Sequence, residues 1–441
     1  MRPSASDLPP TEPDLRRNAG PKRLRAARSL LPMLAFAAFS GAALGCPGGE
    51  TADETTADVV TVGAIFDLTG PTADVGVDYA AGVRGFADWT NSRGGIGGDG
   101  TEGSGVRIDL LFQDYGYQVA RAEQLYSQFV GEGAVVFMGW GTGDTEALAT
   151  RVRDDEIPFS SASLSHRLGD PSEAPYNFLL AASYSDQFRI ALDWIARNHD
   201  EGAPAVALLH NASPFGLSPA RQGGEEFAES RGIELSLHPM PRGAVDFTSE
   251  LIRARQAGAE YVIFQNTSDP AARAMRNARS LGFEATFICL NWCANRQFVD
   301  LAGEAAEGVM GAMPFPPPNA DVPGTRVIKG YLAARGDDVE ERTNAFTQGW
   351  WTFAVFAEAM ERVLASGEEL VGENIRRALE GITDFDMGGV AMPVTFTPTD
   401  HRGAKGLRIY RVEQGAWSPM TDFLEADATP DSEAEAGGEV R

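Results

Sequence analysis

The sequence is short of the residues on which most enzymes and metal centres depend. Its 441 residues include three cysteines and five histidines, and the histidines are scattered along the chain. It contains no G-x-x-x-x-G-K-[ST] loop for nucleotide hydrolysis, no G-x-S-x-G nucleophile turn and no H-E-x-x-H zinc motif. A G-x-G-x-x-G match at 95–100 follows an expected helix, the reverse of the order that a dinucleotide site needs. We therefore expect neither catalysis nor a bound cofactor or metal ion.

Positive charge is also scarce. The chain carries 37 Lys and Arg residues against 62 Asp and Glu residues, a formal net charge of −25. Phosphate backbones repel such a chain, so we do not expect a nucleic-acid partner. The composition, with 43% hydrophobic and 22% charged residues, is typical of globular proteins. The length is sufficient for two domains with proper cores.

The apolar run near the N-terminus is too short to span a membrane. Residues 30–45 are mostly apolar, follow a basic stretch over 1–29 and end at Cys46. A membrane-spanning helix needs roughly twenty apolar residues, so the pattern predicts an export signal over 1–45. The segment Ala43-Leu-Gly-Cys46 resembles the cleavage box of bacterial lipoproteins, in which the cysteine is lipidated. The alternative is a plain secretory signal with an incidental cysteine.

Two segments consist mainly of small, polar and acidic residues. Residues 46–58 begin with the expected lipidated Cys46 and suit a flexible tether between anchor and domain. Residues 425–441 have a similar composition, rich in Ala, Gly and Glu, and we expect a disordered tail there.

The other two cysteines, Cys289 and Cys293, are spaced C-x3-C. In an oxidising compartment they can form a disulfide that closes a very short loop, and the sequence leaves this bridge open. A metal site is the weaker reading, because no histidine or second cysteine pair lies nearby to complete four ligands.

From Val59 onward, short apolar runs alternate with amphipathic segments. Apolar runs of this length between helices indicate parallel sheets covered on both faces, and two successive sets indicate two doubly wound α/β lobes. After these sets, helices at 343–366 and 371–380 and short strands around 392–396 and 406–412 are expected to complete the two lobes. The two sets comprise strands at 59–66, 106–112, 134–138, 157–160, 204–209, 233–237, 260–265 and 286–290, and helices at 76–92, 118–130, 144–154, 185–198, 216–230, 246–256 and 270–281.

Several loop motifs follow one another in this body. They are 66–76 (FDLTGPTADVG), 82–96 (GVRGFADWTNSRGGI), Asp114, 245–251 (VDFTSEL), and 400–403 (DHRG) with 407–412 (LRIYRV). In this order, over residues 59–423, they resemble type I periplasmic binding proteins, in the branched-chain amino acid/amide branch of ABC transporter substrate-binding proteins (leucine/isoleucine/valine-binding-protein-like).

The resemblance implies two Rossmann-like lobes joined by three hinge crossovers, near Leu180, Met313 and Phe385, that close on a small ligand. The lobes are expected to comprise 59–180 plus 313–385, and 181–312 plus 386–424. The implied function is an extracytoplasmic, lipid-anchored solute-binding protein that delivers its ligand to a membrane permease of an ABC transporter. We expect a monomer in the periplasm.

Two loops of the first lobe are the expected ligand contacts, as the resemblance implies. After the third strand, Gly141 and Gly143 let backbone N–H groups point at a ligand, Thr142 adds a hydroxyl and Trp140 an aromatic wall, at the start of a helix that favours negative charge. After the fourth strand, the serine-rich stretch 160–165 offers a polar cradle or plain turn chemistry. Its candidate contacts are Ser161, Ser163 and Ser165.

The matching positions of the second lobe are Tyr184, Phe215, Thr267, Asn291 and Trp292. Amino-acid-binding members of the family often place an acidic residue at the position that matches Asn291, where it pairs with the ligand's ammonium group. Because asparagine cannot supply that charge, we expect an amide or a small aromatic or carboxylic acid to compete with a free amino acid as the ligand. Asp186 or Asp269 are the alternative sources of negative charge.

A function of a different class shares the same fold. A ligand-sensing module would present its ligand state to a receptor partner instead of a permease, with the same residues at the cleft. Fold resemblance alone does not separate the two functions.

Overall fold

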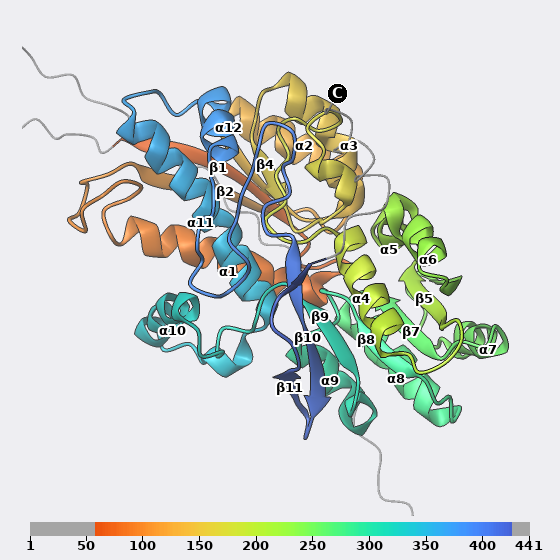
Figure 1. Ribbon diagram of the computed structural model, residues 1–441. Helices are drawn as coiled ribbons and strands as arrows, with labels where there is room; N and C mark the ends of the chain where they lie inside the picture. The colour runs from red at the N-terminus through yellow and green to blue at the C-terminus, as the bar shows by residue number, and fades with distance from the viewer. Residues whose placement is uncertain (1–57, 426–441) are drawn as a thin grey trace, which may run out of the picture. The chain divides into compact units, whose positions relative to one another are not determined.

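The computed structural model describes residues 58–425 (Figure 1). The predicted export signal, the lipidation at Cys46, all but the last residue of the predicted tether and all but the first residue of the predicted tail therefore lie outside the described residues. Within the described part, no helix is both long enough and apolar enough to cross a membrane.

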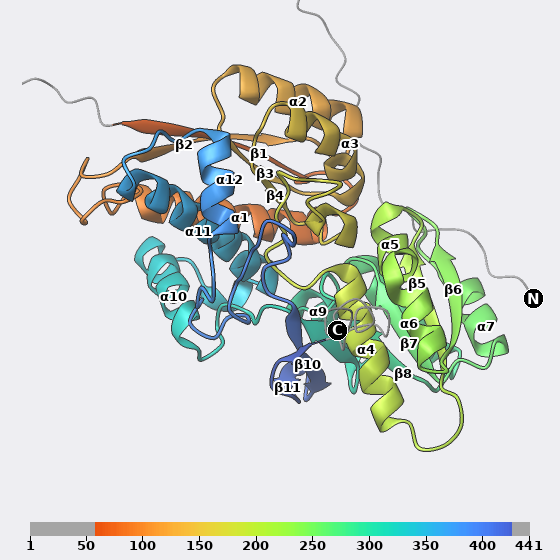
Figure 2. The same cartoon turned by 45° about the horizontal axis from the view of Figure 1, so that its top comes forward.

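The first sheet is parallel and has the strand order β2-β1-β3-β4. Helices α2 and α3 cover one face, and α1 and α11 cover the other, with α12 packed on α11 (Figures 1 and 2). The strands are β1 (Val59–Phe66), β2 (Arg107–Asp114), β3 (Val136–Gly139) and β4 (Phe159–Ser161), and the helices are α1 (Ala73–Asn91), α2 (Val119–Gly131), α3 (Thr142–Asp154), α11 (Asn344–Ala365) and α12 (Gly372–Glu380).

Helices α1 and α11 approach each other closely because each has a glycine at the contact. A Cβ added at Gly82 would lie 2.2 Å from the carbonyl oxygen of Phe346, and one added at Gly349 would lie 2.1 Å from that of Tyr79. Only glycine leaves room for two backbones at this distance. A segment from the last third of the chain is thereby fixed against the first helix.

The second sheet is mixed and has the order β11-β10-β9-β8-β7-β5-β6, with β10 antiparallel to both β9 and β11. A short strand, β12 (Leu424–Glu425), also pairs with β10. The other strands are β5 (Ala205–Asn211), β6 (Glu234–Met240), β7 (Tyr261–Gln265), β8 (Thr286–Cys289), β9 (Met310–Met313), β10 (Gly406–Glu413) and β11 (Ala416–Pro419).

Alternate side chains of these strands pack on opposite faces of the second sheet. Val206 and Leu208 of β5 pack with the helices α4 and α6, whereas Ala207 and Leu209 pack with α7, α8 and α9. Both faces are therefore covered, and the predicted class of two doubly wound α/β lobes is confirmed. The helices are α4 (Tyr184–Asn198), α5 (Pro214–Pro219), α6 (Glu225–Ser230), α7 (Thr248–Gln256), α8 (Ser268–Ser280) and α9 (Arg296–Ala302).

The chain passes between the two sheets three times: after β4, after β9 and before β10. The first and third crossings are hydrogen-bonded side by side. The Leu179 N–H donates to the carbonyl of His401 at 2.9 Å, and the Gly403 N–H donates to that of Leu179 at 2.8 Å. The residue boundaries given above for the two lobes stay predictions.

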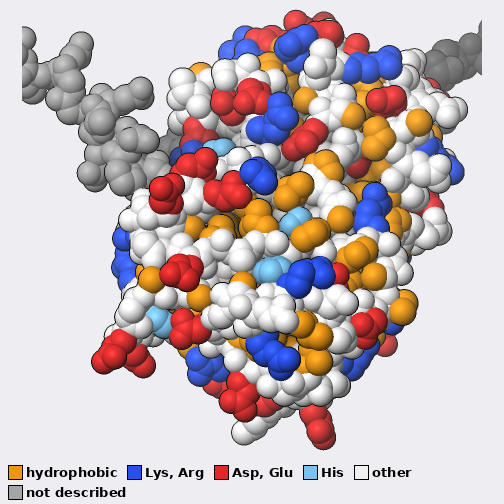
Figure 3. Space-filling view, turned by 90° about the vertical axis from the view of Figure 1, so that its right-hand side faces the viewer, with side chains coloured by type: hydrophobic (Ala, Val, Ile, Leu, Met, Phe, Trp, Pro, Cys, Tyr) orange, Lys and Arg blue, Asp and Glu red, His pale blue; other side chains and the backbone are white. Residues whose placement is uncertain are grey.

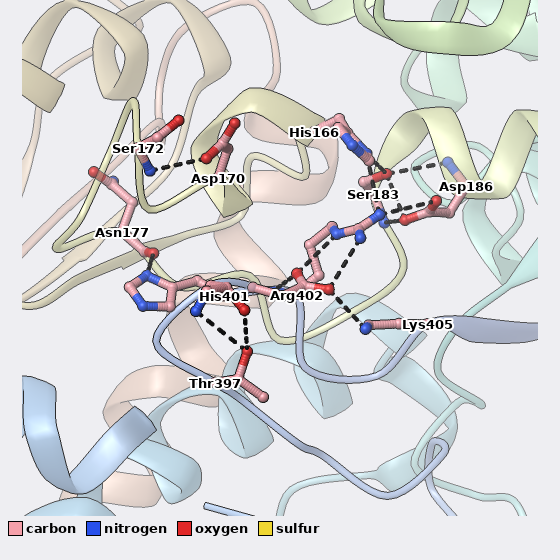
Figure 4. A network of polar contacts seen from close by, with 12 residues as sticks. His166, Asp170, Ser172, Asn177, Ser183, Asp186, Thr397, His401, Arg402 and Lys405 are labelled. Carbon is pink, nitrogen blue, oxygen red and sulfur yellow. Dashed lines mark hydrogen bonds and ion pairs between the residues drawn. The ribbon is translucent and has the colours of Figure 1, made fainter. Parts of the chain in front are cut away.

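A group of polar and charged side chains, here named the crossover cluster, lies at these crossings and consists of Asp186, Asp400, His401 and Arg402 (Figure 4). Arg402 donates to Asp400 at 2.9 Å and contacts Asp186 at 3.5 Å. Burial works against the charge of both carboxylates, but Arg402 holds the pKa of Asp186 below its usual range, and Arg402 with Lys405 lowers that of Asp400 to about 2. The His401 ring stacks on Phe178 with 4.0 Å between ring centroids.

The strand predicted around 392–396 is wrong. This stretch makes a single bridge, between Val394 and Phe385, and no strand. Pro393 in its centre has no N–H to donate to a ladder. The apolar pattern that suggested a strand comes from Val394 and Phe396, which are buried in the core of the first lobe. The sequence pattern also missed α9, β9 and the helix α10 (Pro323–Arg335).

Acidic and basic side chains are interspersed on the face of the molecule shown in Figure 3. The excess of negative charge is not gathered there into one patch of a single sign. This face therefore offers no large patch of one charge to a charged polymer.

Candidate ligand site

A small cavity, here named the inner cavity, lies where the carboxyl ends of the strands of both sheets face each other. Its volume is about 20 Å³. Parallel α/β sheets bind ligands at this end of their strands. The residues that line it are Thr72, Val75, Tyr117, Trp140, Gly141, Thr142, Ala162, Tyr184, Phe215, Thr267 and Trp292.

Seven of the twelve residues predicted as ligand contacts are among these lining residues. Each comes from the loop that follows a strand or from the helix start after it, because the loops at one end of a sheet converge in space. The seven are Trp140, Gly141, Thr142, Tyr184, Phe215, Thr267 and Trp292. Contact with a ligand itself stays a prediction for all twelve.

The start of helix α3 forms the polar side of the inner cavity. Gly141 is the residue before the helix, and its N–H donates to Oδ2 of Asp144 at 3.2 Å. The hydroxyl of Tyr115 donates to the other oxygen of Asp144 at 2.9 Å. A Cβ at position 141 would lie 2.7 Å from that hydroxyl, so the site requires glycine here. Burial raises the pKa of Asp144 to about 7, against these hydrogen bonds.

Aromatic rings from both lobes form the opposite side. The rings of Trp140, from the first lobe, and Trp292, from the second, have centroids 5.2 Å apart at an angle of 60°. Each indole N–H is satisfied: that of Trp140 donates to the hydroxyl of Thr72 at 2.8 Å, and that of Trp292 to the hydroxyl of Tyr184 at 2.9 Å. This edge-to-face contact is favourable between aromatic rings and joins the two lobes directly.

Three predicted residues lie behind the cavity wall. Ser163 donates to the hydroxyl of Thr142 at 2.8 Å, and Ser161 accepts from the N–H of Ser163 at 3.1 Å. The side chain of Asn291 donates to Gln348 of α11 at 3.0 Å. These contacts orient the residues that line the cavity or join the lobes beside it.

The two remaining predicted residues lie on or beside α3. Ser165 donates to Glu146 of α3 at 2.7 Å and accepts from Gln222 of the second lobe at 3.0 Å. Gly143 lies in the first turn of α3, and a Cβ there would meet nothing within 4 Å. Neither residue lines the inner cavity.

The residues that the sequence reasoning missed are Thr72, Val75, Tyr117 and Ala162. Three of them lie in segments that the sequence had already marked: Thr72 and Val75 in the first loop motif, and Ala162 in the serine-rich stretch. Tyr117 is different, because its backbone is left-handed, with φ of 57°, and directly follows Gly116 at φ of 58°. This unusual backbone lets the Tyr117 ring reach the cavity, and no pattern of residue types signals it.

A larger hollow, here named the vestibule, adjoins the inner cavity and has a volume of about 340 Å³. Thr72, Tyr117 and Phe215 line both spaces, so the vestibule and the inner cavity are adjacent. No charged side chain is among the described residues that line the inner cavity, whereas the vestibule has four. The other residues of the vestibule are Pro71, Asp74, Asn211, Pro241, Arg242, Gly243, Ala244, Val245, Phe247, Asn266, Asp269, Pro270 and Arg273.

Two further hollows, of about 640 and 440 Å³, are both lined by Trp417 of β11. They share no lining residue with the inner cavity and include none of the predicted ligand contacts. The strand-end position therefore identifies the smaller inner cavity, and not the larger hollows, as the candidate site.

Cys289 and Cys293 are free, buried thiols. The disulfide that the sequence left open is therefore not formed in this structure. Cys289 ends β8, and the thiol of Cys293 turns toward the carbonyl oxygens of Phe264 and Leu290, each at 3.5 Å. Both side chains pack in the apolar core under α8 and α9.

Comparisons with known proteins agree with this geometry. Residues 59–416 match the family model described as periplasmic binding protein. A structure of a branched-chain amino acid ABC transporter from Thermus thermophilus with bound valine is 28% identical, with a TM-score of 0.76 over 84% of this chain and 97% of that one. A substrate-binding protein of an ABC transporter from Aeropyrum pernix is 27% identical, with a TM-score of 0.76 over 87% of this chain and 100% of that one.

Curated relatives point the same way. The leucine-, isoleucine-, valine-, threonine- and alanine-binding protein of Pseudomonas aeruginosa is 21% identical over 303 residues, which are 67% of this chain and 73% of the relative. The family model covers most of the chain, and the two-lobed fold and the strand-end cavity agree with it, so the protein belongs to the periplasmic binding protein family.

Proposed function

We propose that the protein is an extracytoplasmic solute-binding protein of an ABC uptake system. It captures one small solute in the inner cavity by closure of the two lobes and does not change it chemically. The observation that carries this proposal is that both lobes build one wall, where Trp140 meets Trp292 with 5.2 Å between ring centroids. A solute that replaces this contact touches both lobes and so favours their closed arrangement.

The lining of the cavity favours a ligand with a compact polar end and an apolar body. The N-terminus of α3, with the hydroxyl of Thr142, suits a carboxylate or an amide, because the N–H groups of a first helical turn and the helix dipole favour negative charge. The rings of Trp140, Trp292 and Phe215 suit an apolar or aromatic body. The ligand class is therefore an amino acid, an amide or a small aromatic or carboxylic acid, and the bound valine of the Thermus thermophilus relative belongs to it.

Entry of the ligand requires movement. The inner cavity, at about 20 Å³, has room for about one water molecule. A solute therefore enters when the lobes separate and the two tryptophan rings part. The vestibule adjoins the cavity and provides the path. The crossings between the lobes, with their paired backbone segments, are the place about which such a motion turns.

The same proposal includes the N-terminal anchor and the partner. Export through the signal over 1–45 and lipidation at Cys46 would hold the protein at the outer face of a membrane. The acidic segment 46–58 would leave the binding domain free to reach the permease. A single copy of the chain contains both lobes and the complete cavity, in agreement with a monomer.

A thermal-shift screen tests the proposal. The chain lacking residues 1–46 is heated with amino acids, amides, short-chain acids and aromatic acids, and a ligand of the folded state raises the midpoint by mass action. We expect a shift with one chemical class, its loss in Trp140→Ala, and its retention in the control Trp89→Ala, which removes a tryptophan outside the cavity. No shift with any compound in folded protein would contradict the proposal and favour the sensing module or another ligand class.

A further inference from the structure

A carboxylate with an unsatisfied oxygen lies beside the inner cavity. Asp74 is the second residue of α1, and its Oδ2 accepts the backbone N–H of Asp269, from the second lobe, at 3.1 Å. Its Oδ1 is fully buried and has no hydrogen-bond partner among the described residues. Buried polar atoms are normally paired, because leaving one without a partner destabilises the folded state. Asp74 thus keeps a hydrogen-bonding capacity that the protein itself does not use.

The residue that carries this oxygen borders the solute space. Asp74 lines the vestibule, and Thr72 and Val75 on either side of it line the inner cavity. Burial raises the pKa of Asp74 to about 6, although the N–H of Asp269 and the hydroxyl of Thr267 act in the opposite direction. Thr267 also lines the inner cavity. The carboxylate is therefore at the boundary between the two spaces, in a setting that disfavours its charge as long as no cation is present.

The cationic side chains of the vestibule are engaged elsewhere. Arg273 donates to both oxygens of Asp269, at 3.0 and 2.8 Å. The guanidinium of Arg242 lies over the ring of Tyr117, 5.5 Å from its centroid. Neither forms an ion pair with Asp74 within the described part of the chain, and the negative charge of Asp269 raises the pKa of Asp74 further. The local field at Asp74 thus favours an incoming positive charge.

We propose that Asp74 binds a protonated amine of the solute, so that the ligand is an amine-bearing acid of the amino acid class. This inference rests on the proposed solute-binding function. The amine is held at Asp74, which lines the vestibule, and the acid group at the start of α3, which lines the adjoining inner cavity. Asn291 does not take this role, because it is uncharged and its side-chain amide is bound to Gln348. The negative charge absent from position 291 is supplied from the opposite lobe.

Calorimetric titration of matched ligand pairs tests this assignment. The probes are L-valine with 3-methylbutanoic acid, and L-phenylalanine with 3-phenylpropanoic acid, where each pair differs by the amine. We expect the chain lacking residues 1–46 to bind the amino acid of at least one pair at least about tenfold more tightly than its partner. Asp74→Asn keeps the shape and the acceptor for the Asp269 N–H, and it should lower the affinity for that amino acid by about tenfold or more.

The control is Asp78→Asn, one turn further along α1. The Asp78 carboxylate is bound by the N–H and hydroxyl of Thr343, at 2.6 and 2.7 Å, and lies outside both spaces. This variant should lose stability but keep the preference for the amino acid.

Four results would count against the assignment. Equal binding of the acid without the amine by the wild type would mean that no cation is recognised. Equal weakening of both members of a pair by Asp74→Asn would make Asp74 a contact for closure through Asp269 and nothing more. Binding of the acids but not of the amino acids would defeat this inference and leave the proposed function standing. Binding of no probe to folded protein would count against both.

Discussion

The two lobes meet in two regions that are built from different chemistry. At the crossover cluster, carboxylates are held in their charged form: Arg402 contacts Asp186 and Asp400, and the pKa values of both are lowered. Around the inner cavity the charged form of the carboxylates is disfavoured, since burial raises the pKa of Asp74 to about 6 and that of Asp144 to about 7. The lobes are joined there by the edges of aromatic rings.

This difference separates permanent contacts from replaceable ones. The charges of the crossover cluster have partners within the chain, so this region is complete without a ligand. The residues around the cavity can still form further contacts. Asp74 has an oxygen without a hydrogen-bond partner, and the rings of Trp140 and Trp292 meet only edge to face. Sites that bind or react tend to carry such perturbed groups. Changes at the crossovers should therefore act on stability, and changes at the cavity on ligand affinity.

The largest effect is expected from Arg402→Met. Removing the guanidinium leaves the buried Asp186 with one cationic partner fewer and Asp400 without its main one, which should lower the free energy of unfolding by about 2–3 kcal/mol. Denaturant unfolding measures this value. Arg153→Met, which breaks an exposed pair with Asp154, is the control and should change stability by less than about 0.5 kcal/mol. A large loss of ligand affinity in Arg402→Met with unchanged stability would contradict the assignment of the crossover cluster to stability and of the inner cavity to ligand binding.

A smaller effect, on affinity, is expected from Trp292→Phe. The variant keeps an aromatic ring at this position but loses the hydrogen bond to Tyr184, so ligand affinity should fall by about tenfold. Isothermal titration with a ligand found in the screen measures it. The matched control is Trp417→Phe, which removes an indole N–H bonded at 2.8 Å to the carbonyl of Asn295 outside the cavity. Equal losses of affinity in both variants would show that the effect is not local to the cavity.

The smallest expected effect is a change in pH dependence in Asp144→Asn. The pKa of Asp144 is raised in the folded state to about 7, so the folded protein binds this proton more tightly than the unfolded chain does. Its contribution to stability is complete at low pH and is lost as the pH rises from about 4 through 7. Between pH 5 and 8 the wild type should lose about 1 kcal/mol or more relative to Asp144→Asn. Parallel dependence of stability on pH in the two proteins would contradict this expectation.

The sequence predicted elements well where one buried strand or one amphipathic helix accounts for the whole pattern. The apolar run 59–66 coincides with β1, because a strand buried on both faces needs no alternation. The four-residue strand β9, Met310–Met313, was missed because Gly311 and Ala312 give it a weak signal. At 392–396 the apolar pattern was strong because its side chains are buried. The stretch forms no strand, since Pro393 cannot join a ladder.

The candidate site was predicted at the level of loops and not of side chains. Strand ends converge by topology, which is why Trp140 and Trp292 could be placed together from positions about 150 residues apart in the sequence. Which way a loop side chain points depends on packing that sequence patterns do not encode. Ser163 and Asn291 therefore face partners behind the wall, and Tyr117 reaches the cavity through a left-handed backbone.

The return of the last part of the chain to both sheets has a consequence for its synthesis. Helix α1 packs against α11, and β9 pairs with β10, so each lobe contains a segment made long after the rest of it. A nascent chain that ends before Gly406 leaves the edge of β9 open, and one that ends before Asn344 leaves the inner face of α1 bare. Unpaired edges and bare apolar faces keep a chain from settling into its final state. We therefore expect each lobe to complete its fold only after the segments that begin at Asn344 and Gly406 have been made.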